Sequence, residues 1–580
     1  MSVILGLNIN HFDTSACLII DNKVVAAIAE ERLGVRIKNT SKFPENAIKF
    51  VLDFAGVLPH QIEHIAIARN PKANLHAKIA YAAIHPMPSL RAYSIARSRD
   101  AKSGITIIDF LNSINNTKFH ITPTIHNVEH HIAHISSSYY TSPFEDNTLG
   151  FSYDASGDFV SGMITKCSGS KITVKKKFYL PSSIGFFYTG LCQFIGFDHF
   201  GEEYKVMGLA SYGEDEFSDQ MTKLLRISSN GYSLNMKYFQ MHSGGASGPM
   251  NHENRPIIDI LYTDKMKDLL GDTGNREHLT SREKNIAKSM QIRFENVVLN
   301  TLKNWKKRLG ATKIITAGGG ALNGVTNAKI AQIDGGTPHF IHSAAGDDGT
   351  SVGAALWVSH NTLKNKSRNV LYQAYLGGSY DIKQVINRIQ KDKYRYHIFS
   401  NEDQKINTVA KLLADMNIVG WYQGRSEWGP RALGNRSILA NPAGVDTKKK
   451  INEKIKRREG FRPFAPSVLD KDVSRYFDVD VSSPFMMHVV HFKQEFRNMF
   501  PAVVHVDGTG RLQTVTKDSN SLYYKLITEF RKLTGIGMLL NTSFNENEPV
   551  VETPDEAYDC FKRNDFDALV INDLIVWKNQ

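Results

Sequence analysis

The chain has 580 residues, which is too long for one ordinary domain, so two or more domains are expected. Hydrophobic residues make up 42% of the chain and charged residues 22%, values close to the globular average, which exclude a mainly disordered, collagen-like or coiled-coil protein. Lys and Arg number 70 against 58 Asp and Glu, so the net charge is +12. This mild excess is compatible with an anionic partner, such as a phosphate substrate or a nucleic acid, without requiring one.

The sequence also argues against disulfides, export and membrane insertion. The four cysteines, at positions 17, 167, 192 and 560, are far apart and form no C-x-x-C pair. The start of the chain lacks a basic flank, and its apolar run is too short for a signal peptide. No run of about 18 apolar residues occurs. We therefore predict a cytoplasmic protein that does not enter a membrane, and we expect it to be an enzyme.

Three strands are predicted at the N-terminus, over residues 3–8, 16–20 and 24–29. The polar loop between the first two strands carries His11 and Asp13. Actin-like ATPases present backbone N–H groups to phosphates from such a strand–loop–strand unit, although a structural turn would look the same. No G-K-S or G-K-T occurs, which excludes a P-loop.

Two further polar loops follow predicted strands. The strand 148–153 ends in Asp154-Ala155-Ser156-Gly157-Asp158, and the strand 313–317 ends in three glycines that include Gly319. Helices are predicted over 128–140 and 284–309. Together with the first loop, these loops match a duplicated, actin-like nucleotide cleft.

A metal site is the next hypothesis. His130 and His134 are four residues apart, so on a helix they project from one face, a spacing that suits two imidazole ligands of one metal. Solvated histidines on a helix are the alternative. Asp347, in the run Asp347-Asp348-Gly349, is the favoured third ligand. Two histidines and one carboxylate leave open positions, as a catalytic ferrous or zinc centre needs.

The polar, basic stretch 361–369 is predicted to be a linker. Strands are predicted beyond it over 418–422 and 536–540. The predicted architecture is therefore a larger α/β domain over 1–365 and a smaller α/β domain over 366–580.

Several motifs, in order along the chain, resemble the O-carbamoyltransferases of the nodulation and antibiotic-tailoring type. In the first domain they are the opening loop with His11 and Asp13, Glu30-Glu31-Arg32, H-H-x-x-H, Gly201 to Ala210 (GEEYKVMGLA), Gly318 to Asn323 (GGGALN) and Asp347-Asp348-Gly349. In the second domain they are Gly424 to Leu439 (GRSEWGPRALGNRSIL), Phe461 to Ser467 (FRPFAPS), His505 to Thr509 (HVDGT) and Leu540 to Asn545 (LNTSFN). The resemblance covers nearly the whole chain.

This resemblance implies a fold and a reaction. The first domain would be actin-like, similar to the tRNA threonylcarbamoyl-transferring proteins, and the second would be YrdC-like. The second domain would form carbamoyl-AMP from carbamoyl phosphate and ATP, with Mg²⁺. The first would transfer the carbamoyl group to an acceptor hydroxyl, with a mononuclear metal, iron being favoured, holding the adenylate. A homodimer is compatible with the resemblance.

Site residues follow from the resemblance and from their chemistry. His11 would act as general base or orient the acceptor, beside Asp13, while Lys38, Arg69 and Lys205 would bind the adenylate phosphate or the carbonyl oxygen. Nucleotide and carbamoyl phosphate contacts are assigned to Asp154, Gly319, Asn323, Arg425, Arg431, Arg436, Lys454, Arg457, Arg458, Arg462, Asn541 and Ser543. A solvated basic helix face is the alternative for 448–458, and a structural turn for Asn541 and Ser543.

The acceptor and the reaction class leave alternatives. A sugar-kinase-like phosphotransferase would explain the polar loops but not the second domain. A tRNA threonylcarbamoylation enzyme or a nucleotide-binding regulator fits the motifs less well. A sugar or another small natural product is the favoured acceptor. A hydroxymethylated pyrimidine in DNA is the alternative, because basic stretches also lie away from the motifs, at 91–102, 171–177, 303–308 and 383–395.

Overall fold

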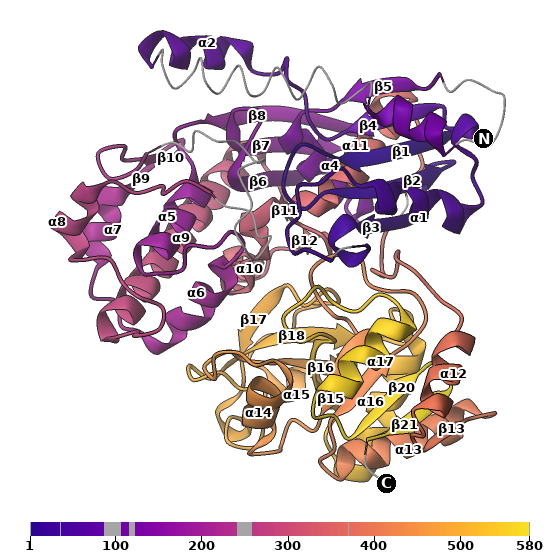
Figure 1. Cartoon of the computed structure of the whole chain (residues 1–580). Helices are drawn as coiled ribbons and strands as arrows, with labels where there is room; N and C mark the ends of the chain where they lie inside the picture. Colours follow the sequence, from indigo (N-terminus) through magenta and orange to yellow (C-terminus); the bar gives the residue numbers. More distant parts are fainter. Residues whose placement is uncertain are drawn as a thin grey trace. The chain divides into compact units, whose positions relative to one another are not determined.

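The computed structural model describes residues 2–34, 36–85, 106–114, 122–240, 258–368 and 370–578. The chain forms two compact units, Met1–Leu371 and Tyr372–Gln580 (Figure 1). The division falls a few residues after the predicted boundary between 365 and 366. The basic stretch 91–102 lies outside the described residues.

The first sheet of the N-terminal unit has five strands in the order β3-β2-β1-β4-β5. Strand β1 pairs antiparallel with β2 and parallel with β4, and β2 pairs antiparallel with β3. Helix α1 (Glu45–Ala55) covers one face, burying Ile48 and Val51 in a core shared with the strands. The strands are β1 (Val3–Asn8), β2 (Ser15–Ile20), β3 (Lys23–Ala29), β4 (His64–Ile67) and β5 (Thr124–Asn127).

The second sheet repeats the arrangement of the first. Its order is β12-β11-β6-β7-β8, in which β6, β7 and β8 form an antiparallel meander and β11 pairs parallel with β6 and β12. Two sheets with the same order and the same strand directions confirm the predicted actin-like duplication. The strands are β6 (Thr148–Gly157), β7 (Val160–Ser168), β8 (Lys171–Tyr179), β11 (Lys313–Ala317) and β12 (His339–Ile341).

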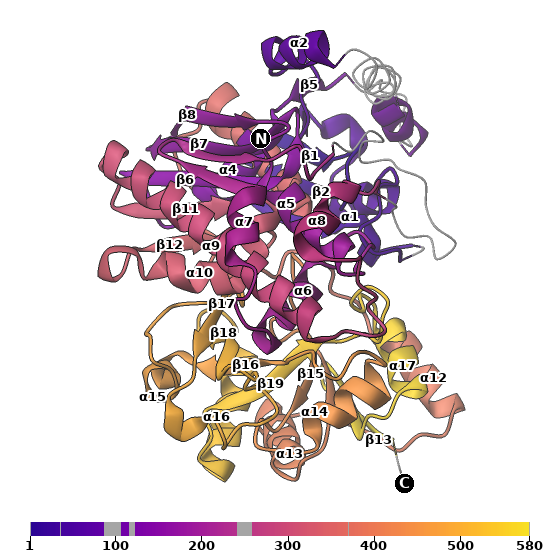
Figure 2. The same cartoon turned by 90° about the vertical axis from the view of Figure 1, so that its left-hand side faces the viewer.

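Two helices, α4 (His130–Thr141) and α11 (Thr350–Trp357), pack on each other between the sheets (Figures 1 and 2). Helix α11 contacts β1 and β2, whereas α4 contacts β6 and β11. Glycine permits the close approach, since a Cβ at Gly353 would lie 1.8 Å from Ala133 O. Every residue of α4 is buried, so its histidines are not the solvated surface residues of the alternative interpretation.

The remaining helices surround this core. The longest, α9 (Ser281–Leu309), begins with a capping box between Thr280 and Glu283 and ends at Gly310, whose φ is 60°. Among the described residues, none of the helices combines the length and the hydropathy that a transmembrane span requires. The others are α2 (Leu75–Ile84), α5 (Ile184–Phe194), α6 (Glu203–Leu209), α7 (Ser218–Leu224), α8 (Lys267–Leu270) and α10 (Gly324–Ala331), with the hairpin β9 (Leu225–Ser228) and β10 (Gly231–Leu234).

The C-terminal unit is built on one mixed sheet of nine strands, in the order β13-β21-β20-β14-β15-β19-β16-β18-β17. Helices α13 (Glu402–Ala414) and α16 (Ser521–Thr534) pack together over it, and their apolar residues share a core with Trp421 and Leu539. The α/β class predicted for this unit is therefore confirmed.

The strands of this sheet are β13 (Tyr396–Ile398), β14 (Val419–Tyr422), β15 (Arg436–Ala440), β16 (Ala465–Leu469), β17 (His488–His491), β18 (Thr509–Val515), β19 (Met538–Ser543), β20 (Ala568–Ile571) and β21 (Leu574–Trp577). The other helices are α12 (Lys383–Lys391), α14 (Thr447–Lys450), α15 (Val473–Tyr476) and α17 (Pro554–Arg563).

The stretch 361–369 is not the loose linker that its composition predicted. A π-helical turn, Val358–Thr362, continues α11 into it. Beyond that turn, the Arg368 guanidinium donates to the carbonyl oxygens of Tyr139 and Ser142 at the end of α4 and stacks on the Tyr139 ring. Cations at a helix C-terminus satisfy its last carbonyls, so the end of the first unit is held against α4.

Candidate active site

The turn after β1 places His11 beside Asp347. His11 Nδ1 lies 2.5 Å from Asp347 Oδ2, and His11 Nε2 lies 3.3 Å from the Ser156 carbonyl oxygen. Asp347 begins the short 3-10 turn that precedes α11, so two segments far apart in the sequence meet here. Burial alone would lower the pKa of His11, but the Asp347 carboxylate outweighs burial and raises it.

The first turn of α4 supplies two more nitrogens. His130 Nε2 and His134 Nε2 lie 3.3 Å and 3.2 Å from Asp347 Oδ1, and His134 Nε2 lies 3.2 Å from Asp154 Oδ2. The ligand atoms of these four residues all lie within 4.8 Å of one another, so they could hold one metal ion, and we call them the metal-binding group for that reason. Asp154 was assigned to nucleotide binding from the sequence, and the structure places it in this group.

The metal-binding group has the donor chemistry of a divalent transition-metal site. Its two imidazole Nε2 atoms are only 3.0 Å apart, and both face carboxylate oxygens. Two nitrogens and two oxygens suit Fe²⁺ or Zn²⁺. Each oxygen of Asp347 has its own partner, since Oδ1 faces His130 and His134 whereas Oδ2 faces His11. An ion bound at Asp347 Oδ1 would therefore leave the contact between Asp347 Oδ2 and His11 in place.

The protonation of the two helix histidines differs because their surroundings differ. Burial, with the neighbouring His134, lowers the pKa of His130. Burial also disfavours charge on His134, but hydrogen bonds to Asp154 and Asp347 raise its pKa to about 9. The carboxylates therefore hold a positive charge at this point, which is the place where a cation would be favoured.

The third histidine of the motif, His131, is not part of the group. Its Nδ1 lies 2.9 Å from Ser152 Oγ and its Nε2 lies 2.9 Å from the Val160 carbonyl oxygen. Burial lowers its pKa well below the usual value. His131 therefore ties α4 to β6 and β7 as a neutral residue.

The irregular end of β6 and the start of the turn after it, residues 154–158, organise the site, which the sequence indicated only in part. Gly319 N donates to Asp154 Oδ2 at 2.7 Å, which joins the glycine run to the metal-binding group. A Cβ at Gly157 would lie 2.0 Å from His130 Cδ2, so only glycine leaves room for the imidazole. Asp158 Oδ2 accepts the backbone N–H of His130 at 2.9 Å. Sequence reasoning assigned no role to Gly157 or Asp158.

The remaining residues predicted in the first unit have structural partners. Asp13 Oδ1 accepts a hydrogen bond from Asn39 Nδ2 at 2.9 Å, and Asn39 directly follows Lys38 in the chain. Burial and nearby carboxylates raise the pKa of Asp13. Lys205 Nζ donates to Glu202 Oε1 at 2.7 Å. Asn323 caps α10 by accepting Thr326 N and is hydrogen-bonded to Gln291, which is a scaffold role.

In the C-terminal unit, two predicted phosphate contacts are buried scaffold residues. Arg436 is 0% exposed, lies over the Tyr422 ring at 3.6 Å, and donates to carbonyl oxygens that include those of Gln423 and Gly378. Asn541 is buried, and its amide donates to Ala432 O, Ser467 Oγ and Gln513 Oε1. Arg436 shapes the loop that precedes it, with no guanidinium face turned to solvent.

A buried lysine, which sequence reasoning did not single out, lies beside the predicted Ser543. Lys456 is 1% exposed, and its Nζ lies 3.2 Å from Ser543 Oγ and 2.6 Å from Asn545 Oδ1. It follows directly on the π-helical turn Ile451–Ile455, so the basic run 448–458 is not one solvated helix face. Lys456 Nζ also donates to the Ser543 carbonyl oxygen, so the ammonium has three acceptors and holds Ser543 and Asn545 in place.

The other predicted cations of this unit differ in exposure. Lys454 is largely exposed and lies 3.2 Å from Asp565, which makes it a surface pair. Arg462 is mostly covered and lies 3.6 Å from Glu459. Arg425 donates to the carbonyl oxygens of Leu376 and Gly377. Arg431 is half-buried in the loop that precedes β15 and Arg436.

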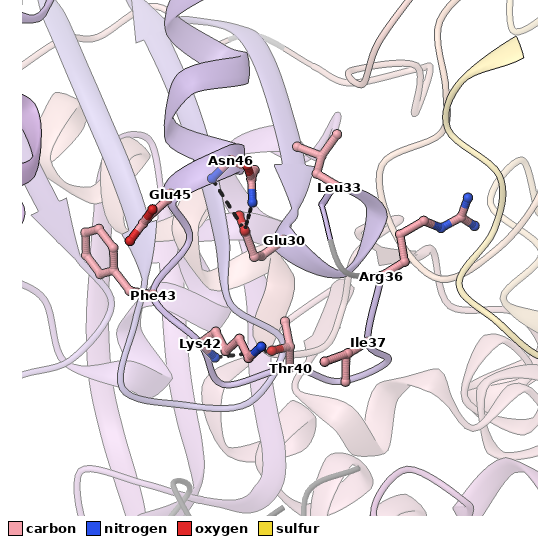
Figure 3. A pocket seen from close by; sticks show the side chains of 9 residues that line it. All are labelled: Glu30, Leu33, Arg36, Ile37, Thr40, Lys42, Phe43, Glu45 and Asn46. Atoms are coloured by element: carbon pink, nitrogen blue, oxygen red, sulfur yellow. Dashed lines mark hydrogen bonds between the residues drawn. The ribbon is translucent and has the colours of Figure 1, made fainter. Parts of the chain in front are cut away.

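A pocket of about 250 Å³ lies apart from the metal-binding group (Figure 3). Glu30 faces it, and the Glu30 carboxylate accepts from Asn46 Nδ2 and Ala47 N at the start of α1, so this residue caps the helix. No member of the metal-binding group lines it. The lining residues are Glu30, Leu33, Arg36, Ile37, Thr40, Lys42, Phe43, Glu45 and Asn46.

Comparison with known proteins identifies the class that this site belongs to. Residues 3–356 match the family model for the carbamoyltransferase N-terminus, and residues 410–578 match the model for the carbamoyltransferase C-terminus. The chain belongs to the carbamoyltransferase family, which confirms the predicted resemblance and the prediction of an enzyme.

Three relatives illustrate the similarity. An uncharacterised Synechocystis protein is 33% identical over all of this chain and 97% of its own. The nodulation protein NolNO of Sinorhizobium fredii is 33% identical over 98% of this chain and 79% of its own. The 3'-hydroxymethylcephem-O-carbamoyltransferase of Amycolatopsis lactamdurans is 33% identical over 40% of this chain and 42% of its own.

Proposed function

We propose that this enzyme is an ATP-dependent O-carbamoyltransferase that forms carbamoyl-AMP in its C-terminal unit and transfers the carbamoyl group to an acceptor hydroxyl in its N-terminal unit. The observation that carries the proposal is the metal-binding group with His11 attached to it through Asp347. Membership of the carbamoyltransferase family supplies the group that is transferred. The cephem relative, by its name, carbamoylates a hydroxymethyl oxygen.

The first half-reaction is assigned to the residues around Lys456. Water cleaves carbamoyl phosphate to carbamate and phosphate, and a carbamate oxygen attacks the α-phosphorus of ATP, which is bound with Mg²⁺. The P–O bond to the β-phosphate breaks and pyrophosphate leaves. Lys456 holds Ser543 and Asn545 in place, and these two residues, with Arg462 nearby in sequence, are the proposed contacts for the anionic reactants.

The second half-reaction is assigned to His11. The acceptor oxygen attacks the carbonyl carbon of carbamoyl-AMP, the C–O bond to the phosphate breaks, and AMP leaves. Asp347 Oδ2 accepts the Nδ1–H of His11. In the neutral imidazole Nε2 then carries no proton and takes the acceptor proton, and in the imidazolium Nε2–H donates to the Ser156 carbonyl oxygen at 3.3 Å. Asp347 also stabilises the imidazolium that results.

One divalent ion, with Fe²⁺ favoured, is assigned to His130, His134, Asp154 and Asp347. When bound, it would supply positive charge close to the adenylate phosphate and the carbonyl oxygen. His134 and Asp347 are otherwise buried charges that depend on each other.

A small hydroxylated molecule, such as a sugar, is the proposed acceptor. The case for a nucleic-acid acceptor rested on basic stretches away from the motifs, and several of their cations have acidic partners in the structure. Lys177 pairs with Glu129, and Lys306 pairs with Asp334. Arg388 pairs with Asp555 and Asp559. These pairs reduce the charge that a phosphate backbone would meet.

The function is tested by incubating the protein with ATP, carbamoyl phosphate and a panel of alcohols that includes hydroxymethylated DNA. We expect pyrophosphate, phosphate and AMP to be released, and mass spectrometry should show one carbamoyl group gained by a small alcohol. ADP formation would instead support the kinase alternative. A carbamoyl gain on DNA alone, with binding that weakens steeply with salt, would replace the small acceptor by a nucleic acid.

The metal assignment has its own test. Replacing His130, Asp154 or Asp347 by Ala should weaken Fe²⁺ or Co²⁺ binding by tenfold or more while the fold survives, because each change removes one donor from a large, otherwise stable unit. His278→Ala, at an exposed position, is the control. If the Asp154 variant bound the metal with wild-type affinity, Asp154 would not be a metal ligand and its assignment to nucleotide binding would stand.

A further inference from the structure

Three of the five residues 154–158, at the end of β6 and the turn after it, contact the candidate site. Asp154 belongs to the metal-binding group, the Ser156 carbonyl oxygen faces His11, and Gly157 leaves room for the His130 ring. Asp158 is different, because its carboxylate is turned to backbone N–H groups and not to the group itself. The proposed reaction gives Asp158 no task.

One oxygen of Asp158 accepts two hydrogen bonds from separate segments. Oδ2 lies 2.9 Å from the backbone nitrogen of His130 and 2.8 Å from that of Asn70. His130 is the first residue of α4. The first N–H groups of a helix have no partner within it, and a carboxylate both satisfies one and interacts favourably with the helix dipole. Asp158 thus holds the end of α4 from which both histidine ligands project.

The second hydrogen bond leads to the loop of His11. Arg69, the neighbour of Asn70, donates from Nη1 to the Asn10 carbonyl oxygen at 3.0 Å, and Asn10 directly precedes His11. A single carboxylate oxygen is therefore connected to the helix that carries the metal ligands and, through Arg69, to the loop that carries the base. We propose that Asp158 is a positioning residue that keeps His11 in register with the metal-binding group.

Other contacts hold the same corner, so the fold does not depend on Asp158 alone. The Asn74 amide donates to the Asp158 carbonyl oxygen at 3.0 Å and to Glu129 Oε1 at 2.8 Å. Lys177 Nζ donates to both oxygens of Glu129, at 2.7 Å and 2.8 Å. Removing the carboxylate should therefore leave the backbone N–H groups of Asn70 and His130 without this acceptor, while the surrounding backbone keeps its conformation.

The backbone conformation allows a clean pair of variants. Asp158 has a φ of 51°, which glycine and asparagine adopt with little strain. Asp158→Gly removes the carboxylate, whereas Asp158→Asn keeps one acceptor oxygen. Asp21→Gly is the matched control, because Asp21 also has a positive φ, of 45°, in a hairpin turn, and its Oδ1 accepts Ser2 N at 2.8 Å, away from the site.

The first measurement is amide hydrogen exchange on the full, metal-free chain. Asp158→Gly should speed exchange about tenfold in peptides covering residues 69–71 and 129–133 together, because both lose their acceptor. Asp158→Asn should stay close to wild type. Asp21→Gly should leave both peptides unchanged. Unchanged exchange in Asp158→Gly, or equal acceleration in Asp158→Asn, would overturn the proposal.

The second measurement links the residue to the site and rests on the proposed metal function. Asp158→Gly should weaken Co²⁺ binding about tenfold, as the loss of an orienting contact does in metal sites, and Asp158→Asn should restore it. If wild-type protein bound no ion while the exchange result held, the metal assignment would fail and the positioning role would stand. If Asp158→Gly bound Co²⁺ as tightly as wild type, Asp158 would not position α4 for metal binding, and the proposal would be contradicted.

Discussion

Arginines that look alike in the sequence have different surroundings in the structure. Arg436 lies in the same run as Arg425 and Arg431, yet it is 0% exposed and its guanidinium donates to backbone carbonyl oxygens on several sides. A planar fork with five donors can satisfy more carbonyl oxygens at fixed angles than an ammonium, which has three donors. The spacing of charges along the chain gave no sign of this difference, because both roles call for the same side chain.

Arg436→Lys should therefore destabilise the C-terminal unit without a direct effect on phosphate binding. Lysine keeps the charge but leaves buried carbonyls without donors, at a cost of roughly 3 kcal/mol. Chemical unfolding followed by circular dichroism measures the change. Arg457→Lys, at an exposed position, is the control and should stay within about 0.5 kcal/mol of wild type. A variant as stable as wild type would assign Arg436 to ligand binding instead.

Individual strands were predicted well from the sequence, whereas contacts between strands and helices were not. Strands 3–8 and 313–317 were predicted with the bounds of β1 and β11, because apolar runs ended by glycine or polar residues are local signals. The H-x-x-x-H pair is also local. Asp154 was not recognised as part of the metal-binding group, because its approach to His134 depends on how α4 packs against β6, and no local pattern in the sequence reports that tertiary contact.

The loop after β12 should make stability depend on pH. His342 is 1% exposed, and burial lowers its pKa to about 4, against the usual value near 6.5. Between pH 6.5 and 4, His342 is protonated in the unfolded chain but stays neutral in the folded chain. Stability should therefore fall as the pH drops from about 6.5 to 4, by roughly 3 kcal/mol at most from this residue.

Unfolding midpoints of wild type and His342→Gln between pH 7 and 4 test this expectation. The variant should start less stable and show a shallower slope, because it lacks the histidine proton. His278→Gln, at an exposed position, is the control and should follow the wild-type slope. Parallel slopes for wild type and His342→Gln would contradict a neutral, buried His342.

At the scale of the whole molecule, each unit has its own polar site, so the two half-reactions should be separable. Lys456→Met should reduce pyrophosphate release from ATP and carbamoyl phosphate by at least about tenfold, because it removes a buried cation beside Ser543 and Asn545. His11→Asn should keep pyrophosphate release and lose carbamoyl transfer. Lys450→Met, at an exposed lysine of the same basic run, is the control.

The opposite pattern would reverse the assignment of steps to units. Loss of pyrophosphate release in His11→Asn, with release intact in Lys456→Met, would place adenylate formation in the N-terminal unit. Added carbamoyl-AMP distinguishes the steps further, because it should restore transfer in Lys456→Met but not in His11→Asn.

The repeated strand order of the two N-terminal sheets has a consequence for how such enzymes diversify. His11 lies in the turn after β1 and Asp154 lies in the irregular end of β6, each just beyond the regular pairing of its hairpin. On the proposed function, the two copies of one architectural part have separate tasks, because the first segment would move the proton and the second would hold the ion. A change in one copy would then leave the other intact. New alcohols would be accepted through changes around the first segment, while the second segment keeps the chemistry that all of them share.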